Sequence, residues 1–457
     1  MKRINQQKKI IYVFLLKGGF LAHTHTHTHP KKMDIHCLPA DVWKLITDNL
    51  PLCDIIALMG TTKKIRNNIC NKWVGVSGDG VTGLVKIHTM SSLAEFVECI
   101  RPSFPTSFKW RIQLCKIDVS SVKEEVMMAL GDIHSLYLSK CTGDVSALGS
   151  VHELHLDRCT DVTDVSAFGS VHKLFIRGCI GVTDVSALGG VRELDLDGCT
   201  YVTDVSMLGG VHKLFLGGCT RVTDVSKLGG VHFLDLSDCT GVTDVSMLGS
   251  VHKLNITRCV GLHDVSVLGS VRELYLDECT DVTDVSALGG VHELFLGGCT
   301  RVTDVSALGN VHKLHLNGFI GVTNVSALGS VHTLNLFGCT GVTNVSMLGR
   351  VHKLHLRRCT NITDVSALGG VHTLNLFGCT GVTDVSALGS VHSLTLSGCT
   401  RVTDVSALGG VRELNLDGCT GVKNVSMLGR VHKLILRRCI DITDVSMLDN
   451  VRFHIRL

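Results

Sequence analysis

Two residue types that can do chemistry recur at a fixed interval along most of this chain. Fifteen cysteines form one row from Cys141 to Cys439, with Phe319 in the one place where a cysteine is missing. Thirteen histidines form a second row from His134 to His432. Cysteine and histidine are metal ligands, and together they make a nucleophile and its base. Metal binding, disulfide formation and nucleophilic catalysis are therefore the chemistries to weigh.

The regularity of both rows argues against catalysis. A catalytic group should be singular, whereas each Cys, His and Asp recurs in nearly every interval, so we expect no catalytic residue, no enzyme, no metal and no cofactor. A row that accepts Phe319 is a buried apolar row, and reduced, buried thiols indicate the cytoplasm or nucleus. Disulfides or a metal row are the alternatives. The histidines predict a structural rim, in which mutual repulsion favours neutral rings; pH sensing and metal binding are the alternatives.

The interval is a repeat of 20 residues. The segment Val151–Ser170, VHELHLDRCTDVTDVSAFGS, recurs fifteen times without a gap from Val151 to Asn450, after a clipped copy at 133–150. Seven positions per repeat are nearly always apolar or Cys, namely Val151, Leu154, Leu156, Cys159, Val162, Val165 and Phe168 in the first. Such a period indicates a solenoid, whose stacked coils bury a core that no single coil could bury.

Each coil should contain one short strand and a tight return path. The segment VHELHL ends in the alternation that is typical of a strand with one buried face. The rest of the repeat leaves room for a mostly non-helical arc with one 3₁₀ turn. Thr163, Asp164 and Ser166 can hydrogen-bond the nearby backbone there, and Gly169 would permit the bend into the next strand.

The repeats resemble leucine-rich repeats, L-x-x-L-x-L-x-x-N/C-x-L, with Val at the first position and Cys where Asn often stands. The phrase CTDVTDVSAF is also similar to a shortened form of the cysteine-containing class. The resemblance covers residues 133–457 and implies an α+β repeat protein, a leucine-rich-repeat solenoid with one parallel β-strand per coil. It implies no particular ligand, because this fold serves many functions.

Partner specificity should reside in the positions that the strand points outward, the third, fifth, seventh and eighth of each repeat. They hold 14 basic and 13 acidic residues, a balance that argues against nucleic acid. Exposed aromatic side chains recur there, and with two arginines they are the candidate residues for binding a protein substrate: Phe175, Phe215, Phe295, Phe337, Phe377, Arg357 and Arg437. Drift among recently duplicated repeats is the alternative. No apolar run reaches the roughly 18–20 residues of a membrane span.

The part before the repeats has three sections. Residues 1–32 combine basic residues, the apolar run IIYVFLL and an alternating HTHTHTH, so we expect a disordered or untranslated leader. A signal segment, which would make the protein secreted, and metal binding by the histidines are alternatives. Residues 33–74 predict three short helices with a small core. Residues 75–132 should be a linker and irregular capping coils, with a glycine-rich loop over 74–83 and a strand over 109–117.

The stretch MDIHCLPADVWKLITDNLPLCDIIALM at residues 33–59 resembles the F-box motif, with a departure at the Gly-Thr-Thr that follows it. This resemblance implies docking on a Skp-type adaptor of a cullin ubiquitin ligase through Leu38, Pro39, Val42, Ile46, Leu50, Ile55 and Leu58. An F-box followed by leucine-rich repeats is a known pairing. It implies a non-catalytic substrate-recognition subunit, monomeric within the ligase complex. The alternative is a leucine-rich-repeat interaction scaffold in which the helices only cap the solenoid.

Overall fold

The computed structural model describes residues 133–442, 445–448 and 451–454 and, nearer the N-terminus, 74–76, 82–87, 109–115 and Leu130. Its contacts divide the chain into two compact units, Met1–Gly181 and Val182–Leu457, called unit 1 and unit 2 below. The expected leader and the F-box-like stretch fall in residues 1–73, outside the described residues. The adaptor-docking residues therefore stay a prediction.

Unit 1 combines one antiparallel strand pair with a parallel series. Its strands are β1 (Val74–Val76), β2 (Thr82–Ile87), β3 (Lys109–Cys115), β4 (Ser135–Ser139), β5 (Glu153–Asp157) and β6 (Lys173–Phe175). β1 runs antiparallel to β2, and the parallel pairs are β2 with β3, β3 with β4, β4 with β5 and β5 with β6. The strand predicted over 109–117 is confirmed by β3. The loop predicted over 74–83 is wrong at its ends, where Val74–Val76 pairs with residues 83–85, because valine favours extended backbone.

Unit 2 contributes one three-residue strand per coil to a parallel sheet. The strands are β7 (Glu193–Asp195), β8 (Lys213–Phe215), β9 (Phe233–Asp235), β10 (Lys253–Asn255), β11 (Glu273–Tyr275), β12 (Glu293–Phe295), β13 (Lys313–His315), β14 (Thr333–Asn335), β15 (Lys353–His355), β16 (Thr373–Asn375), β17 (Ser393–Thr395), β18 (Glu413–Asn415), β19 (Lys433–Ile435) and β20 (Arg452–His454). Equivalent residues pair from coil to coil, as Leu254 does with Leu274. The repeat thus sets the register, and the predicted strand per coil is confirmed.

Most return paths contain the predicted 3₁₀ turn, and the described one that lacks it lies in the coil 231–250. In unit 1 the turns are η5 (Ser146–Leu148) and η6 (Ser166–Phe168). In unit 2 they are η7 (Ser186–Gly190), η8 (Ser206–Gly210), η9 (Leu228–Gly230), η10 (Ser266–Ser270), η11 (Ser286–Gly290), η12 (Ser306–Asn310), η13 (Ser326–Ser330), η14 (Ser346–Arg350), η15 (Ser366–Gly370), η16 (Ser386–Leu388), η17 (Ser406–Gly410), η18 (Ser426–Leu428) and η19 (Ser446–Leu448). Among the described residues, no helix has the length and apolar character needed to cross a membrane.

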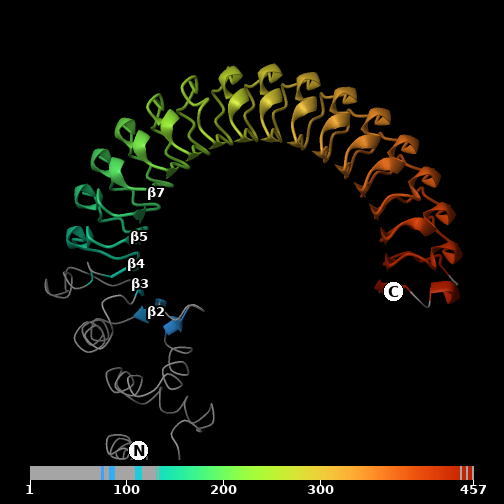
Figure 1. The fold of residues 1–457 in the computed structure, drawn as a ribbon, viewed down its shortest axis with the longest axis horizontal. Coiled ribbons are helices and arrows are strands. Elements are labelled where there is room, and N and C mark those ends of the chain that lie inside the picture. Colours follow the sequence, from blue (N-terminus) through green and yellow to red (C-terminus); the bar gives the residue numbers. More distant parts are fainter. Residues whose placement is uncertain are drawn as a thin grey trace, which may run out of the picture. The chain divides into compact units, whose positions relative to one another are not determined.

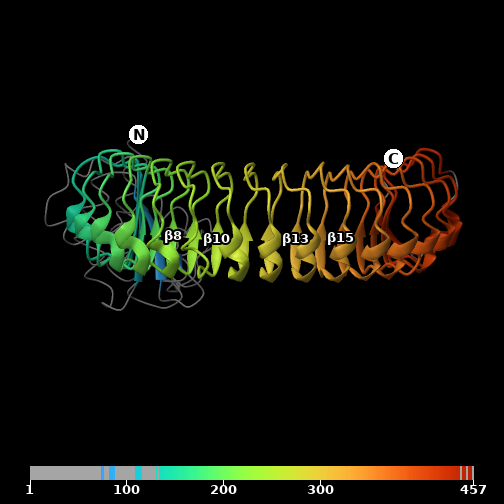
Figure 2. The same ribbon diagram turned by 90° about the horizontal axis from the view of Figure 1, so that it is seen from above.

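The coils of unit 2 follow an arc, with their strands on its inner side and their 3₁₀ turns on its outer side (Figure 1). Figure 2 shows the same coils lying side by side in chain order. The strands of adjacent coils lie about 4.8 Å apart, which is closer than the 3₁₀ turns of adjacent coils can pack. Because each coil is narrower at its strand than at its 3₁₀ turn, stacking curves the unit and leaves the strands on the concave side.

The apolar positions of the repeat form the core. In the coil that begins at Val371, this residue is 1% exposed, and Leu376, Cys379 and Val382 are fully buried. Phe319, which replaces a cysteine, is 1% exposed and is among the largest buried side chains. The core predicted from the repeat is therefore confirmed in the described coils.

The return path is organised by hydrogen bonds from the backbone to an aspartate. The backbone N–H of Ser166 donates to Asp164 Oδ1 at 2.8 Å, and Ser186 does the same with Asp184 at 2.9 Å. These bonds favour the charged carboxylate, so the backbone and side chain of Ser186 lower the pKa of Asp184. The prediction that Asp164 bonds the nearby backbone is confirmed.

The glycine at the bend is required for a different reason than expected. Gly169 has a φ of −60°, which any residue can adopt, so conformational freedom does not explain it. A Cβ at the equivalent Gly149 would lie 2.3 Å from the carbonyl oxygen of Ala167, and one at Gly189 would lie 2.5 Å from that of Met207. Glycine stands here because neighbouring coils approach too closely for a side chain.

Candidate binding face

The outward positions of the strands form a continuous surface in each unit, which we call the strand face. In β15 and the residues after it, Leu354 and Leu356 point into the core, while Lys353, His355 and Arg357 point outward. Because β15 pairs in register with β14 and β16, equivalent outward residues of successive coils stand beside each other. Side chains at one position can therefore stack along the unit.

Aromatic rings at the fifth position stack on their neighbours in unit 2. Phe295 lies between Tyr275 and His315, with ring centroids 4.4 and 4.3 Å away and nearly parallel planes. Phe215 makes a tilted contact of 4.9 Å with Phe233, at the third position of the next coil. Phe295 and Phe215 are half-buried. The sequence proposed Phe215 and Phe295 as individual binding residues, whereas the structure joins each ring to a partner in the adjacent coil.

Unit 1 has a similar stack. His155 lies between Tyr137 and Phe175, with ring centroids 4.0 and 4.2 Å away. Its Nε2 also lies 3.1 Å from Glu153 Oε1, while Ser135 donates to Glu153 Oε2 at 2.9 Å. These bonds, that of His155 first, lower the pKa of Glu153 to about 2. Phe175 is thus the last ring of an ordered stack whose middle ring, His155, contacts the Glu153 carboxylate.

A cation–π sandwich lies at the seventh position. The guanidinium carbon of Arg357 is 5.4 Å from the ring centroid of Phe337 and 4.5 Å from that of Phe377. These phenylalanines belong to the coils before and after that of Arg357, so the rings cover the guanidinium from opposite sides. The structure thus brings together three residues that the sequence proposed individually.

Two asparagines hold these phenylalanines in place. Asn335 Oδ1 accepts the backbone N–H of Phe337 at 3.1 Å, and Asn375 Oδ1 accepts that of Phe377 at 2.9 Å. This bond orders the backbone where the strand ends. Sequence reasoning missed both asparagines, although the Asn-Leu-Phe spacing in two coils was a signal that could have found them.

Most charged residues at the third position of unit 2 are paired along the sheet. Lys213 lies 3.7 Å from Glu193, Lys253 lies 2.9 Å from Glu273, and Lys313 also pairs with Glu293. Exposed pairs of this kind contribute about 0–1 kcal/mol each. Their effect is to neutralise much of the charge that the strand face presents.

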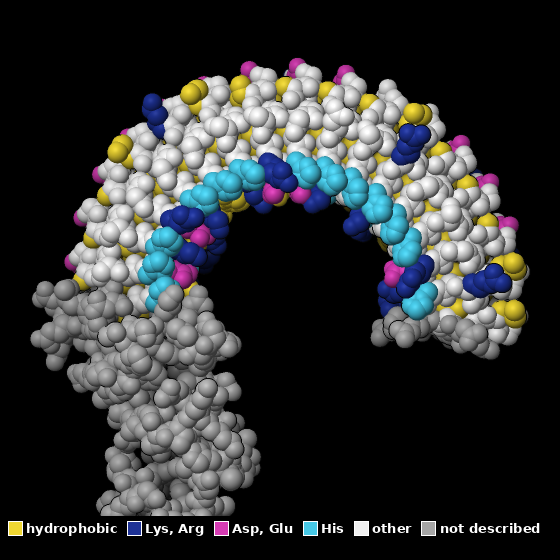
Figure 3. Space-filling view, viewed as in Figure 1, with side chains coloured by type: hydrophobic (Ala, Val, Ile, Leu, Met, Phe, Trp, Pro, Cys, Tyr) yellow, Lys and Arg dark blue, Asp and Glu magenta, His cyan; other side chains and the backbone are white. Residues whose placement is uncertain are grey.

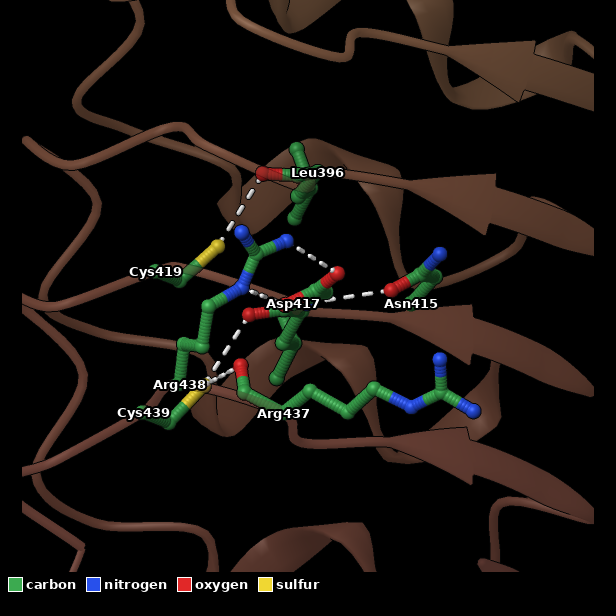
Figure 4. A network of polar contacts seen from close by, with 8 residues as sticks. Leu396, Asn415, Asp417, Cys419, Arg437, Arg438 and Cys439 are labelled. Atoms are coloured by element: carbon green, nitrogen blue, oxygen red, sulfur yellow. Dashed lines mark hydrogen bonds and ion pairs between the residues drawn. The ribbon is translucent and has the colours of Figure 1, made fainter. Parts of the chain in front are cut away.

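Arg437, a predicted binding residue, differs from its neighbour. Arg438 donates from Nε to Asp417 Oδ1 at 2.9 Å and from Nη2 to Oδ2 at 2.7 Å. Figure 4 shows Arg438 turned onto Asp417 while Arg437 extends away from it. The bidentate bond to Arg438 lowers the pKa of Asp417. Arg437 is exposed and thus free to contact a partner.

The cysteine row is internal to the fold and does not contribute to the strand face. The described cysteines of the row, from Cys141 to Cys439, are free and buried, which confirms the prediction of buried thiols. From Cys219 to Cys299 and from Cys339 to Cys439 the thiol of each coil donates to the preceding coil, as Cys379 does to Leu356 O at 2.9 Å. Burial raises the pKa of Cys339 and Cys399 to about 11. Such thiols are poor nucleophiles at neutral pH.

The histidine row follows the inner margin of the arc in unit 2 (Figure 3). From His292 to His392 the rings of neighbouring coils lie 4.5–4.7 Å apart. Burial, and then the positive charge of neighbouring histidines and lysines, lowers the pKa of His332 and His372. The neutral form expected from the sequence is therefore favoured at these two histidines. Among the described residues, no three His, Cys, Asp or Glu side chains are arranged to hold a metal ion.

Comparisons with known proteins concern the fold. No protein-family model and no curated protein matches this sequence. An internalin from Listeria monocytogenes is 16% identical, with a TM-score of 0.41, over 74% of this chain and 91% of its own. The functional domain of InlJ from the same species, described as including a cysteine ladder, is 18% identical (TM-score 0.44; 70% and 73% covered). A leucine-rich-repeat protein of Leptospira interrogans is 16% identical (TM-score 0.41; 76% and 86% covered).

Proposed function

We propose that this chain is a non-catalytic protein-binding scaffold whose strand face contacts the partner. One observation carries the proposal: the inward positions repeat almost unchanged, while the outward positions differ from coil to coil. Core packing does not require that variety, because the apolar core is built from the inward side chains. Tyr275 and Phe295, ordered by stacking, and Arg357 are residues of the types that dominate interface energetics.

The test compares two surfaces of the same protein. The tagged full chain, a Tyr275→Ser/Phe295→Ser variant and a Met207→Ser/Met247→Ser variant would be expressed in the native cells, and bound proteins would be quantified by mass spectrometry. The methionines are 62% and 60% exposed and lie away from the strands, which makes them the matched control. We expect partners to be lost only with the strand-face variant. Equal retention in both variants would contradict the proposal.

The finer proposal is that the scaffold serves a Skp–cullin–F-box ubiquitin ligase as its substrate receptor. It is supported by the F-box-like spacing of Leu38, Pro39, Ile46 and Ile55 in the sequence. A receptor of this kind works in the cytoplasm or nucleus, where buried free thiols persist. The alternative is an interaction scaffold without a ligase.

Adaptor binding separates these two functions. The full chain and a Leu38→Ala/Pro39→Ala/Ile55→Ala variant would be titrated with a purified Skp-type adaptor, and circular dichroism would verify that both are folded. We expect the intact chain to bind and the variant to lose binding. If the folded chain does not bind the adaptor, the ligase-receptor function is wrong and the interaction scaffold without a ligase remains.

A further inference from the structure

The sandwiched arginine presents ordered hydrogen-bond donors. The Arg357 guanidinium carbon lies over the rings of both Phe337 and Phe377, and both rings are half-buried while Arg357 is exposed. The edge of a guanidinium carries its N–H groups in a planar fork that matches a carboxylate. Among the described residues Arg357 has no ion-pair partner, so these donors remain available at the surface.

The surroundings of Arg357 add positive charge without compensation. Lys353 in the same coil and Arg358 next to it are exposed, and neither has an ion-pair partner among the described residues. The outward positions from residue 313 to residue 398 contain no Asp or Glu. Elsewhere in unit 2, by contrast, Lys213, Lys253 and Arg258 each meet an acid of an adjacent coil.

The backbone conformation of Arg358 is a second observation on the same surface. This residue has a φ of 59°, whereas the neighbouring coils place Gly338 and Gly378 at this position. A left-handed conformation is unfavourable for a non-glycine residue. Its guanidinium carbon lies 6.0 Å from the Phe337 ring, on the same cluster as Arg357. A charged residue thus stands at a strained position where both neighbouring coils have glycine, and backbone strain of this kind is concentrated at functional sites.

We propose that this cluster, Phe337, Lys353, Arg357, Arg358 and Phe377, binds an acidic peptide segment of the partner protein. One Asp or Glu carboxylate accepts two hydrogen bonds from the edge of Arg357, while Lys353 and Arg358 attract the acids that flank it. The exposed rims of the two phenylalanine rings contact apolar residues of the segment. This inference rests on the proposed function, since it names the class of segment that the strand face recognises.

The direct test uses two labelled peptides and the full chain. The first is a fluorescein-labelled peptide in which Glu alternates with Leu, and the second has Gln in place of every Glu. Fluorescence polarisation should show the Glu peptide binding at least about tenfold more tightly, the effect of one charge-assisted contact of about 1.4 kcal/mol. Arg357→Gln should remove most of this preference.

The matched control is Arg221→Gln. Arg221 makes the same kind of contact, with its guanidinium carbon 4.4 Å from the Tyr201 ring centroid, but lies on a return path outside the strand face. We expect this variant, which has the same net charge as Arg357→Gln, to retain the peptide preference. Phe377→Leu, which uncovers one face of Arg357, should weaken binding of the Glu peptide and leave the circular dichroism spectrum unchanged.

Several outcomes would overturn the inference. Equal binding of both peptides, no binding of either, or an equal loss in Arg357→Gln and Arg221→Gln would show that the cluster does not read carboxylates. Binding of a phosphoserine version of the peptide without binding of the Glu peptide would show that the cluster binds phosphate groups instead of carboxylates. If the peptides fail but partners are still lost with Tyr275→Ser/Phe295→Ser, only this inference fails. If that variant also retains its partners, the proposed function fails with it.

Discussion

Seven charged residues hold the left-handed backbone conformation that glycine favours. They are Lys140, Arg158, Asp238, Arg258, Glu278, Arg358 and Arg438, and all of them occupy the eighth position of their coil. The other described coils have glycine there, with φ between 65° and 77°. The turn after the strand therefore requires positive φ, and side chains at this position are retained against a conformational cost.

Replacing one of these residues by glycine should stabilise the protein. For Glu278→Gly (φ 60° in the native chain) we expect a gain of about 0.5–1 kcal/mol, since relief of the strain exceeds the entropy lost by glycine. The reverse change Gly298→Ala should destabilise, because this residue has a φ of 77° and its new Cβ would lie 3.1 Å from Glu278 Cγ. Urea denaturation measures both. A loss of stability in Glu278→Gly would show that its side chain stabilises the turn.

The buried thiols should make the protein sensitive to alkaline pH. Burial raises the pKa of Cys399 from 9.0 to about 11, so this thiol ionises at lower pH in the unfolded chain than in the folded one. Its contribution to the free energy of unfolding is therefore complete below pH 9 and is lost as the pH rises towards 11. When the pH is raised from 8 to 10, the free energy of unfolding should therefore fall by about 1 kcal/mol less in Cys399→Ala than in the native protein. Denaturation at both pH values measures this, and parallel losses would refute it.

At the scale of one coil, strand and return path are stabilised by the same interior. Leu376 is fully buried, and its carbonyl oxygen accepts the Cys399 thiol at 3.1 Å. Its side chain fills the space between the strand and the 3₁₀ turn, and its backbone is bonded to the next coil. Removing the side chain should leave a cavity that neighbouring coils cannot close, because backbone hydrogen bonds hold their spacing.

We therefore expect Leu376→Ala to destabilise the protein by about 2–5 kcal/mol. The control is Met347→Ala, a similar truncation at a side chain that is 60% exposed on a return path, which should change stability by less than about 0.5 kcal/mol. Chemical denaturation of both variants measures the difference. Equal effects would mean that the coil interior is loosely packed.

At the scale of unit 2, each coil touches only its neighbours, so stability should vary along the stack. Side-chain burial already changes towards its last coils: Leu416 and Cys419 are fully buried, whereas Leu436 is 5% and Cys439 is 8% exposed. Coils with fewer layers packed beyond them should open more readily.

Hydrogen exchange should show this gradient. The amide of Leu296 donates to His315 O at 2.9 Å in the middle of unit 2, and that of Leu416 donates to Ile435 O at 2.9 Å near its end. Although the two hydrogen bonds are alike, we expect exchange at Leu416 to be faster under native conditions, as measured by mass spectrometry of the corresponding peptides. Equal protection would show that unit 2 opens as one cooperative block.

The sequence by itself determined the local and periodic features of this protein. A strict repeat places each inward residue beside its copy, so strands, 3₁₀ turns, register, core and the buried thiol row could all be predicted from one coil. It also identified Phe337, Arg357 and Phe377, because outward positions follow from alternation. The strand of β1 was missed, because its glycine-rich neighbours outweighed two valines in the prediction.

Only the tertiary structure decided which of these outward residues contact one another. Whether Phe295 stands alone or stacks on Tyr275 depends on the side chain twenty residues away, which lies in an adjacent coil only after folding. The same holds for the sandwich around Arg357, for the pairing of Arg438 rather than Arg437 with Asp417, and for the glycine at the bend. Periodicity sets which side chains point outward, but contact geometry between coils sets which of them remain free to bind.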